Sequence, residues 1–158
     1  MHKLLKLFLS VIICEGVGIL GSIFTIPSIS TWYAFLHKPL FSPPNWIFGP
    51  VWTSLYFLMG VSLFLLLEQK KKLKKQKKTL LILFSVQLFL NFLWSVIFFG
   101  LHLPLYAFIE IMLLWMSIEL LIVDFWKFSK PAALLLVPYI CWVSFALMLN
   151  LFVVLLNP

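Results

Sequence analysis

The sequence predicts an all-α membrane protein that folds as one five-helix bundle, and three observations support this. Hydrophobic residues make up 63% of the 158 residues and charged residues only 11%, with a mean hydropathy of +1.10. That composition lies far outside the range of soluble domains. Five apolar runs are close to or above the roughly 20 residues that a helix needs to cross a bilayer. Because these runs are continuous and do not alternate, they favour helices over a β-barrel.

The five helices are predicted to follow one another in a single membrane domain that covers residues 1–158. We expect them at residues 5–27, 51–67, 79–99, 106–123 and 132–156. The first run follows Lys3 and Lys6 and could be mistaken for a secretory signal. It is longer than such a signal and no small-residue cleavage pattern follows it, so we interpret it as a helix of the mature protein.

The lysines predict the orientation of these helices. Lysines precede the first run, fill the segment Lys70–Lys78 and recur at Lys127 and Lys130, which places eleven of the twelve basic residues on one side of a five-span chain. Lys38 alone lies on the other side. By the positive-inside rule, the N-terminus is cytoplasmic and the C-terminus lies outside.

The run Lys70–Lys78 could suggest nucleic-acid binding, but it is confined to a short hairpin between two membrane helices. We interpret it as a contact with anionic lipids, which contributes about 1 kcal/mol per lysine near the membrane surface. We expect no nucleic-acid partner.

The loop at residues 28–50 is too elaborate for a simple connector. It combines tryptophan, tyrosine and phenylalanine side chains with four prolines, in the sequence TWYAFLHKPLFSPPNWIFGP. A connector between two membrane helices has no need of so many aromatic rings. We therefore expect this loop to act as a structured lid on the outer side.

Polar and aromatic residues recur at helical spacing within the predicted spans. A polar side chain in lipid is costly unless it faces protein or water, so such stripes indicate the inward faces. The stripes comprise Trp52, Tyr56 and Met59 in the second span, Gln87, Asn91, Trp94 and Phe98 in the third, Glu110 in the fourth, and Tyr139, Trp142, Ala146 and Asn150 in the fifth.

If these stripes converge, they line a cavity rich in aromatic faces below the lid, which suits a flat, hydrophobic and partly polar ligand. The alternative for any one residue is a plain structural role, as a hydrogen bond between helices or part of an interfacial aromatic belt. Glu15 lies among glycines in the first span. We interpret it mainly as a packing residue, with a role in the cavity as the alternative.

Several kinds of chemistry have no support in the sequence. A Gly-rich phosphate loop, a Ser/His/Asp set and a carboxylate pair at catalytic spacing are all missing, which argues against hydrolase or kinase activity. His37 and His102 fall in outer loops, but two isolated histidines are weak evidence for haem ligation. We predict no metal site and no required cofactor.

The segment TWYAFLHKPLFSPPNWIFGPVWTSLYFLMG, with LNFLWSVIFFG and PYICWVSFALMLN further on, resembles the TspO/MBR family, which includes the translocator proteins or peripheral benzodiazepine receptors. The resemblance covers the whole chain. It implies a five-helix bundle, usually a homodimer, that binds protoporphyrin IX, haem and synthetic ligands such as PK11195. For a prokaryotic member it implies the plasma membrane.

Carried over by motif, the resemblance implies that the ligand contacts are Tyr33, Pro43, Trp52, Tyr56, Asn91, Trp94, Trp142 and Ala146. Secondary candidates from the stripes and the loop are Trp32, Gln87, Glu110, Tyr139 and Asn150. Some bacterial members degrade protoporphyrin in light with two pocket tryptophans, and Trp52 and Trp142 occupy similar positions.

Two departures limit what the resemblance implies. A cholesterol motif needs a basic residue after its tyrosine, and no lysine or arginine follows Lys130. The third span also lacks the glycine or alanine residues that some members use for dimer contact, so a dimer would use another face or larger side chains. The leading hypothesis is a protein that binds tetrapyrroles for transport, sensing or regulation. A light-dependent porphyrin-degrading enzyme and a ligand-dependent regulator of a partner protein are the alternatives.

Overall fold

The computed structural model describes residues 2–69 and 74–158, and within these residues the chain forms helices and loops only. Five helical segments are long and apolar enough to cross a membrane. The predicted five-helix membrane fold is therefore confirmed. The cationic segment predicted to contact lipid, Lys70–Lys78, falls partly on residues 70–73, which lie outside the described residues.

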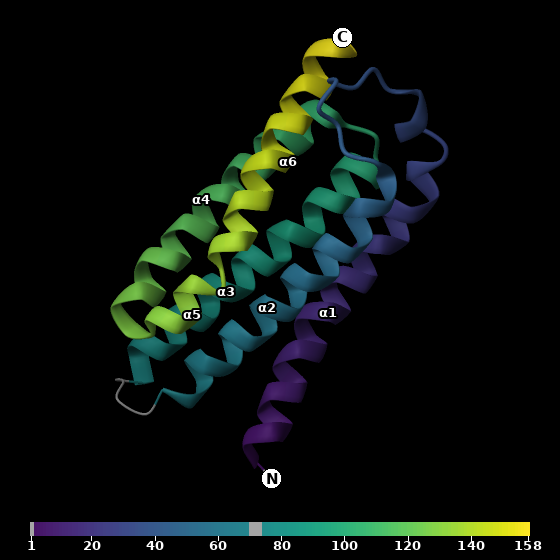
Figure 1. Ribbon diagram of the computed structural model, residues 1–158. Coiled ribbons are helices and arrows are strands. Elements are labelled where there is room, and N and C mark those ends of the chain that lie inside the picture. Colours follow the sequence, from purple (N-terminus) through teal and green to yellow (C-terminus); the bar gives the residue numbers. More distant parts are fainter. Residues whose placement is uncertain (1, 70–73) are drawn as a thin grey trace.

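The helices carry the labels of Figure 1 and extend beyond most of the predicted bounds. They are α1 (His2–Ile29), α2 (Phe48–Glu68), α3 (Lys74–Ser95), α4 (Pro104–Phe128), α5 (Lys130–Leu134) and α6 (Val137–Leu156). Two 3-10 turns, Tyr33–Phe35 and Asn45–Ile47, lie in the loop before α2, and a π-helical segment, Val96–Gly100, extends α3.

The structure divides the fifth predicted span, residues 132–156, into α5 and α6. Pro138 has no backbone N–H to donate to the carbonyl four residues before it, so a continuous helix is interrupted there. The chain makes a tighter turn instead, in which the Leu136 N–H donates to the Ala133 carbonyl at 3.0 Å. This break leaves α5 near α2 and lets α6 run separately along α4.

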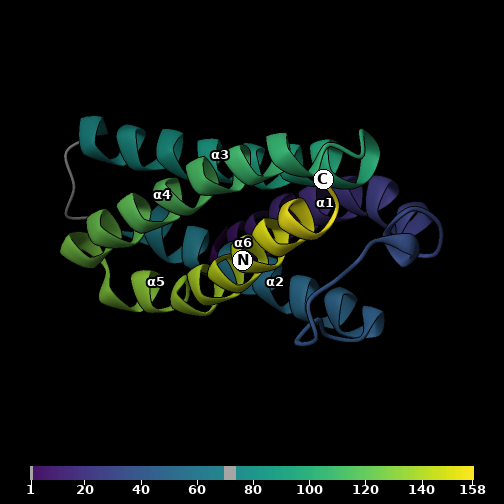
Figure 2. The ribbon, with the colours of Figure 1, turned by 90° about the horizontal axis from the view of Figure 1, so that it is seen from above.

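The helices pack in a closed order around the bundle. α1 lies beside α2 and α3, α3 beside α4, and α4 beside α6, while α5 closes the gap between α2 and α4. In the view from above, α3 lies on one side of the bundle and α2 on the other (Figure 2). The N-terminus lies at one end and the C-terminus at the other, as five membrane crossings require (Figure 1).

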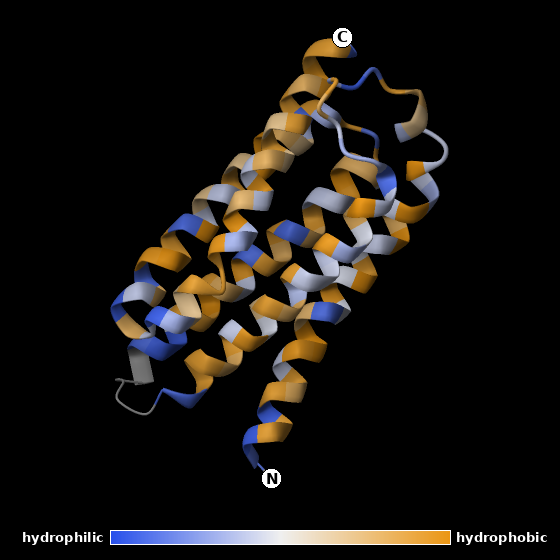
Figure 3. Ribbon diagram, in the orientation of Figure 1, coloured by the Kyte–Doolittle hydropathy of each residue, from blue (hydrophilic) through white to orange (hydrophobic). Residues whose placement is uncertain are grey.

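Apolar side chains cover the outer surface of the helices as well as their contacts. Hydrophobic residues dominate all the spans, and hydrophilic residues gather at the end that carries the N-terminus (Figure 3). The most deeply buried stripe is on α4, where Leu114, Ile118, Leu121 and Phe125 have almost no exposed surface. Because lipid tails are as apolar as leucine, close packing and polar contacts between helices must hold the bundle together.

α1 and α2 approach each other closely at Gly60. A Cβ atom placed on Gly60 would lie 2.5 Å from the Cα of Val11, which is backbone and cannot rotate away. Gly60 is therefore the residue that allows α1 and α2 to meet at this level. Gly16 on α1 has no atom within 4 Å of such a position.

We expect Gly60→Ala to separate α1 from α2 and destabilise the protein by about 1–3 kcal/mol, as overpacking does. The measurement is thermal unfolding of the purified protein in detergent, where each kcal/mol corresponds to a shift of about 2–4 °C. Gly16→Ala is the matched control and should leave the melting temperature unchanged or slightly raised. Equal melting temperatures for the two variants would contradict this account of the contact.

Candidate functional site

A cavity of about 240 Å³ lies in the outer half of the bundle, between α1, α2, the outer end of α3 and α6. Its lining is mostly apolar and aromatic, with several small residues on α1. The lining residues are Glu15, Gly18, Ile19, Gly21, Ser22, Thr25, Ile26, Ile29, Phe48, Gly49, Trp52, Thr53, Tyr56, Trp94, Ser95, Phe99, Trp142 and Ala146.

Five residues implied as ligand contacts lie together in this lining: Trp52, Tyr56, Trp94, Trp142 and Ala146. Phe48 and Trp142 make an edge-to-face contact across the α2–α6 boundary, with ring centroids 6.1 Å apart. Trp52 packs against Tyr56 at 5.8 Å on the same helix. The cavity is therefore walled by ring faces and edges supplied by different helices, which favours a flat apolar ligand.

Apart from the alternative role of Glu15, the sequence did not predict that α1 would contribute to the cavity lining. Gly18, Ser22 and Thr25 recur at spacings of four and three residues, and Gly21 lies beside them on the same face of α1. A Cβ on Gly18 would lie 2.5 Å from the Tyr56 ring, so this glycine makes room for the tyrosine. In the sequence these glycines indicate only that helices can come into close contact. Their periodicity was the signal that could have marked a cavity wall.

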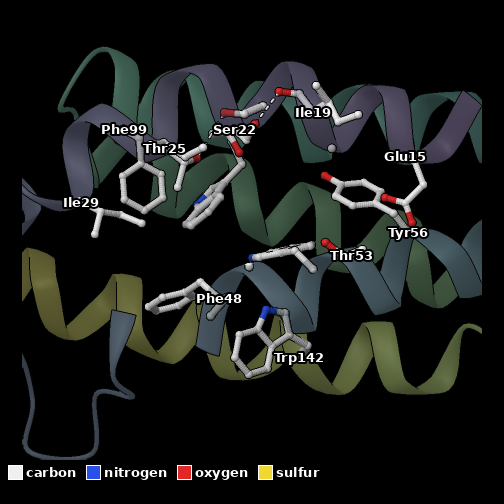
Figure 4. Close-up of a pocket in the computed structure, with 18 residues that line it drawn as sticks. Glu15, Ile19, Ser22, Thr25, Ile29, Phe48, Thr53, Tyr56, Phe99 and Trp142 are labelled. Atoms are coloured by element: carbon white, nitrogen blue, oxygen red, sulfur yellow. Dashed lines mark hydrogen bonds between the residues drawn. The ribbon is translucent and has the colours of Figure 1, made fainter. Parts of the chain in front are cut away.

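The inner end of the cavity, which we call the floor, is formed by Glu15 and Tyr56. These two side chains lie at one end of the pocket, whereas Ile29, Phe48 and Phe99 lie at the other (Figure 4). Within the described residues, Glu15 makes no recorded hydrogen bond or ion pair. The structure places it at the cavity, which is the alternative role that the sequence left open, rather than in a helix contact alone.

A buried hydrogen-bond chain lies below the floor and joins three helices. The Tyr56 hydroxyl donates to the Asn91 amide oxygen, and the Asn91 amide nitrogen donates to the Tyr139 hydroxyl at 2.8 Å. Asn91 and Tyr139 do not line the cavity. Both are buried and hold Tyr56 in place from behind, so Asn91 lies next to a lining residue and not in the lining itself.

Asn150 positions a second aromatic wall. Its side chain accepts a hydrogen bond from Trp94 Nε1 at 3.1 Å and donates to the Pro104 carbonyl at 2.8 Å. Trp94 in turn stacks on Phe98 with centroids 5.1 Å apart. Asn150 therefore acts behind the wall and does not contact the cavity itself.

Two further candidates, Gln87 and Glu110, are buried in the bundle away from the cavity lining. Gln87 Nε2 lies 4.0 Å from the Met59 sulfur. Among the described residues, the Gln87 oxygen and both Glu110 oxygens have no hydrogen-bond partner. The Trp142 Nε1–H is also buried without an acceptor among the described residues, although the Trp142 ring lines the cavity.

The lid candidates Trp32, Tyr33 and Pro43 do not line the cavity in this structure. Tyr33 is buried against the rings of Phe48 and Phe99, both of which are lining residues, and this burial raises the pKa of its hydroxyl. Trp32 stacks on His102 at 4.4 Å. Tyr33 therefore forms a layer above the cavity, and Trp32 fastens the loop to the turn between α3 and α4.

The loop is also attached to α6. The Asn157 side chain accepts a hydrogen bond from the His37 N–H and donates to the His37 carbonyl, both at 2.9 Å. Phe41 packs edge-on against Phe152 at 5.3 Å. Lys38 donates to the Tyr33 carbonyl at 3.0 Å and lies over the Tyr33 ring. The loop is thus a fixed cover at the outer end of the bundle.

The cavity reaches the surface between the outer halves of α1 and α2. Ile19 and Ile26 on α1 are both lining residues and about two-thirds exposed, and Gly49 and Thr53 on α2 are also exposed. Residues that line a cavity and are exposed at the same time mark its opening. Since the loop covers the outer end, this opening faces sideways, toward the lipid.

Comparisons with known proteins agree with the resemblance in the motifs. The TspO/MBR family profile matches residues 10–156. The chain is 46% identical over 156 residues to the tryptophan-rich protein TspO of Chlorobaculum tepidum, covering 99% of this chain and 98% of that protein. It is 46% identical over 155 residues to the same-named protein of Archaeoglobus fulgidus, covering 98% and 99% of the two chains. It is 36% identical over 133 residues to the translocator protein of Ovis aries, covering 84% of this chain and 79% of that protein.

We expect Asn91→Ala to leave the Tyr56 and Tyr139 hydroxyls without their shared partner. Hydrogen bonds between membrane helices average about 0.6 kcal/mol each, so the loss of two should cost about 1 kcal/mol. This corresponds to a fall of about 2–4 °C in the melting temperature. Asn45→Ala, in the exposed loop, is the control and should have no effect.

A double-mutant cycle of Asn91→Ala with Tyr139→Phe tests the connection itself. The stability losses caused by substitutions within one hydrogen-bond network are not additive. The double variant should therefore lose less stability than the sum of the losses of the two single variants. Additive losses would show that the chain below the floor does not act as one unit.

Proposed function

This chain belongs to the TspO/MBR family, and from that premise we propose that it binds porphyrin-type tetrapyrroles, such as protoporphyrin IX and haem, in the aromatic cavity. The chain is a multi-pass integral membrane protein. The observation that carries the proposal is the lining itself. Trp52, Trp94 and Trp142, from three different helices, border one cavity in the outer half of the membrane.

The size of the cavity bears on how a porphyrin would enter. A volume of about 240 Å³ is below the roughly 300–1,000 Å³ typical of sites for drug-sized ligands. A macrocycle would therefore enter edge first, with its remainder in the sideways opening between α1 and α2. Its charged propionates would stay toward the outer surface, where Lys38 lies, because an unpaired carboxylate is costly at the membrane centre.

The binding would serve the transport, sensing or regulation of tetrapyrroles, and the cavity would also take flat synthetic ligands such as PK11195. We further propose a homodimer and, for a prokaryotic cell, a location in the plasma membrane. The lid loop would shield the outer end of a bound ligand. A regulatory interaction with a partner protein would use the cationic hairpin, of which residues 70–73 lie outside the described residues.

The described part of this hairpin, at the start of α3, has a groove that supports the proposed contact with anionic lipid. This open groove has one cation at its cytoplasmic end and is otherwise mostly apolar. Its residues are Lys78, Leu81, Ile82, Ser85, Val86 and Phe89. This arrangement suits a lipid whose headgroup phosphate contacts the ammonium and whose acyl chain follows the helix.

A second candidate function is light-dependent porphyrin degradation. The observation that favours it is that Trp52 and Trp142 border the same cavity from α2 and α6. A tryptophan next to an excited porphyrin could donate an electron or react with singlet oxygen formed from dissolved dioxygen. No ordinary acid–base or nucleophilic machinery would be needed.

Protoporphyrin IX should quench the tryptophan fluorescence of the purified protein in a saturable way. Trp52→Phe combined with Trp142→Phe should weaken the affinity about tenfold, since each aromatic contact contributes about 0.5–1.5 kcal/mol beyond its area. The measurement is a fluorescence titration in detergent.

Trp126→Phe is the matched control, because Trp126 lies near the cytoplasmic end of α4 and outside the cavity. The affinity of this variant for protoporphyrin IX should stay within about twofold of that of the parent protein. Quenching that never saturates would refute the proposed binding, and so would an equal loss of affinity in the control.

Illumination of the porphyrin complex distinguishes light-dependent degradation from porphyrin binding without degradation. If the protein degrades porphyrin, the Soret absorption should fall faster than for free pigment, with one defined product that disappears in both Trp52→Phe and Trp142→Phe. Bleaching at the rate of the free pigment would exclude the enzymatic role and leave the binding role intact.

A further inference from the structure

Glu15 is the ionisable side chain at the floor of the cavity, near the middle of α1. A charged side chain at the centre of a membrane helix costs about 2.5–3.5 kcal/mol on insertion, so an unpaired carboxylate is disfavoured there. Within residues 2–69 and 74–158, no hydrogen bond or ion pair engages its carboxyl group. An ionisable group that faces a membrane cavity without a partner indicates a ligand that supplies one.

Tyr56 is the other residue that forms the floor. Both Tyr56 and Glu15 line the same end of the cavity (Figure 4). Because the Tyr56 hydroxyl donates its proton to Asn91, its oxygen is left only as an acceptor. The Tyr56 hydroxyl is engaged below the floor, so the Glu15 carboxyl is the floor group left to meet a ligand, and it accepts hydrogen bonds once it has lost its proton.

The walls next to this floor suit a cation with a flat body. Trp52 and Tyr56 stand one turn apart on α2, and Trp142 faces them from α6. Ring faces attract ammonium groups by about 0.5–2 kcal/mol, most strongly where water is excluded. The small volume of about 240 Å³ favours a compact molecule over an extended one.

We propose that this cavity binds compact aromatic amines, with the ligand nitrogen at Glu15 and its ring between Trp52 and Trp142. The inference uses the cavity of the proposed function but does not depend on porphyrin binding. It assigns Glu15 the role of the residue that selects a basic nitrogen among flat apolar ligands.

The sideways opening explains how a charged pair could form at the membrane centre. An amine crosses lipid in its neutral form and enters between α1 and α2. The Glu15 carboxylic acid then transfers its proton to the amine nitrogen, which leaves a carboxylate and an ammonium in contact. The proton moves within the pair, so the net charge stays zero and no other reactant is required.

The test compares two ligands that differ in one group. Naphthylethylamine and naphthylethanol have the same ring and chain length, and only the first has a basic nitrogen. Each is titrated by calorimetry into the full-length protein in lipid nanodiscs, with protein-free nanodiscs as the blank for partition into lipid. We expect the parent protein to bind the amine at least about tenfold more tightly than the alcohol.

Glu15→Gln should reduce the ratio of the two affinities to near one, because the amide cannot supply a proton or hold an ammonium as its counter-ion. Glu119→Gln is the matched control: Glu119 is an exposed carboxyl on α4 outside the cavity, and its loss should leave the ratio unchanged. Circular dichroism confirms that each variant is folded.

A parent protein that binds the alcohol as tightly as the amine would overturn the inference, and so would a Glu15→Gln variant that keeps the preference. Absence of binding by both ligands would overturn it as well. Protoporphyrin quenching, measured on the same parent preparation, reports separately on the proposed function. An amine preference without porphyrin quenching would refute tetrapyrrole binding and support the role of Glu15.

Discussion

The structure depends on one constraint: a polar group that lies in lipid is costly unless it finds a partner inside the protein, because no water is available to it. The backbone meets this constraint by forming helices. Among the side chains, Asn91 meets it by joining Tyr56 to Tyr139, and Asn150 meets it by joining Trp94 to the Pro104 carbonyl. These same contacts orient two walls of the cavity, so the requirement for satisfied polar groups also shapes the site.

The cavity results from a change in helix spacing along the bundle. At Gly60 the α1 and α2 backbones come close together, since a Cβ there would lie 2.5 Å from the Val11 Cα. Nearer the outer end, Gly18 makes room for the Tyr56 ring, and large aromatic side chains take the place of direct helix contact. α2 meets α5 at the cytoplasmic end, while the outer halves of α2 and α6 are joined by rings such as Phe48 and Trp142.

The outer loop complements this arrangement by closing the one end that would face water. Its contacts fall on separate parts of the bundle: Trp32 on the α3–α4 turn, His37 on the end of α6, and Tyr33 on the rings above the cavity. A cover attached at several points excludes water from the aromatic walls. Electrostatic and cation–π interactions inside are correspondingly stronger than at an open surface.

The sequence by itself determined the membrane class, the number of helices and the inward stripes, because hydrophobic length and helical periodicity are local properties. It also predicted that Trp52, Trp94 and Trp142 would border one cavity, since each lies on such a stripe. The tertiary structure alone decided that Asn91 and Asn150 act behind the walls, that Tyr33 forms a layer above the cavity, and that Glu15 lies at its floor. Those assignments depend on the distance and rotation between neighbouring helices, which glycines such as Gly18 and Gly60 set through contacts with residues far away in the chain. Periodicity along one helix cannot reveal which side of a partner helix it will meet.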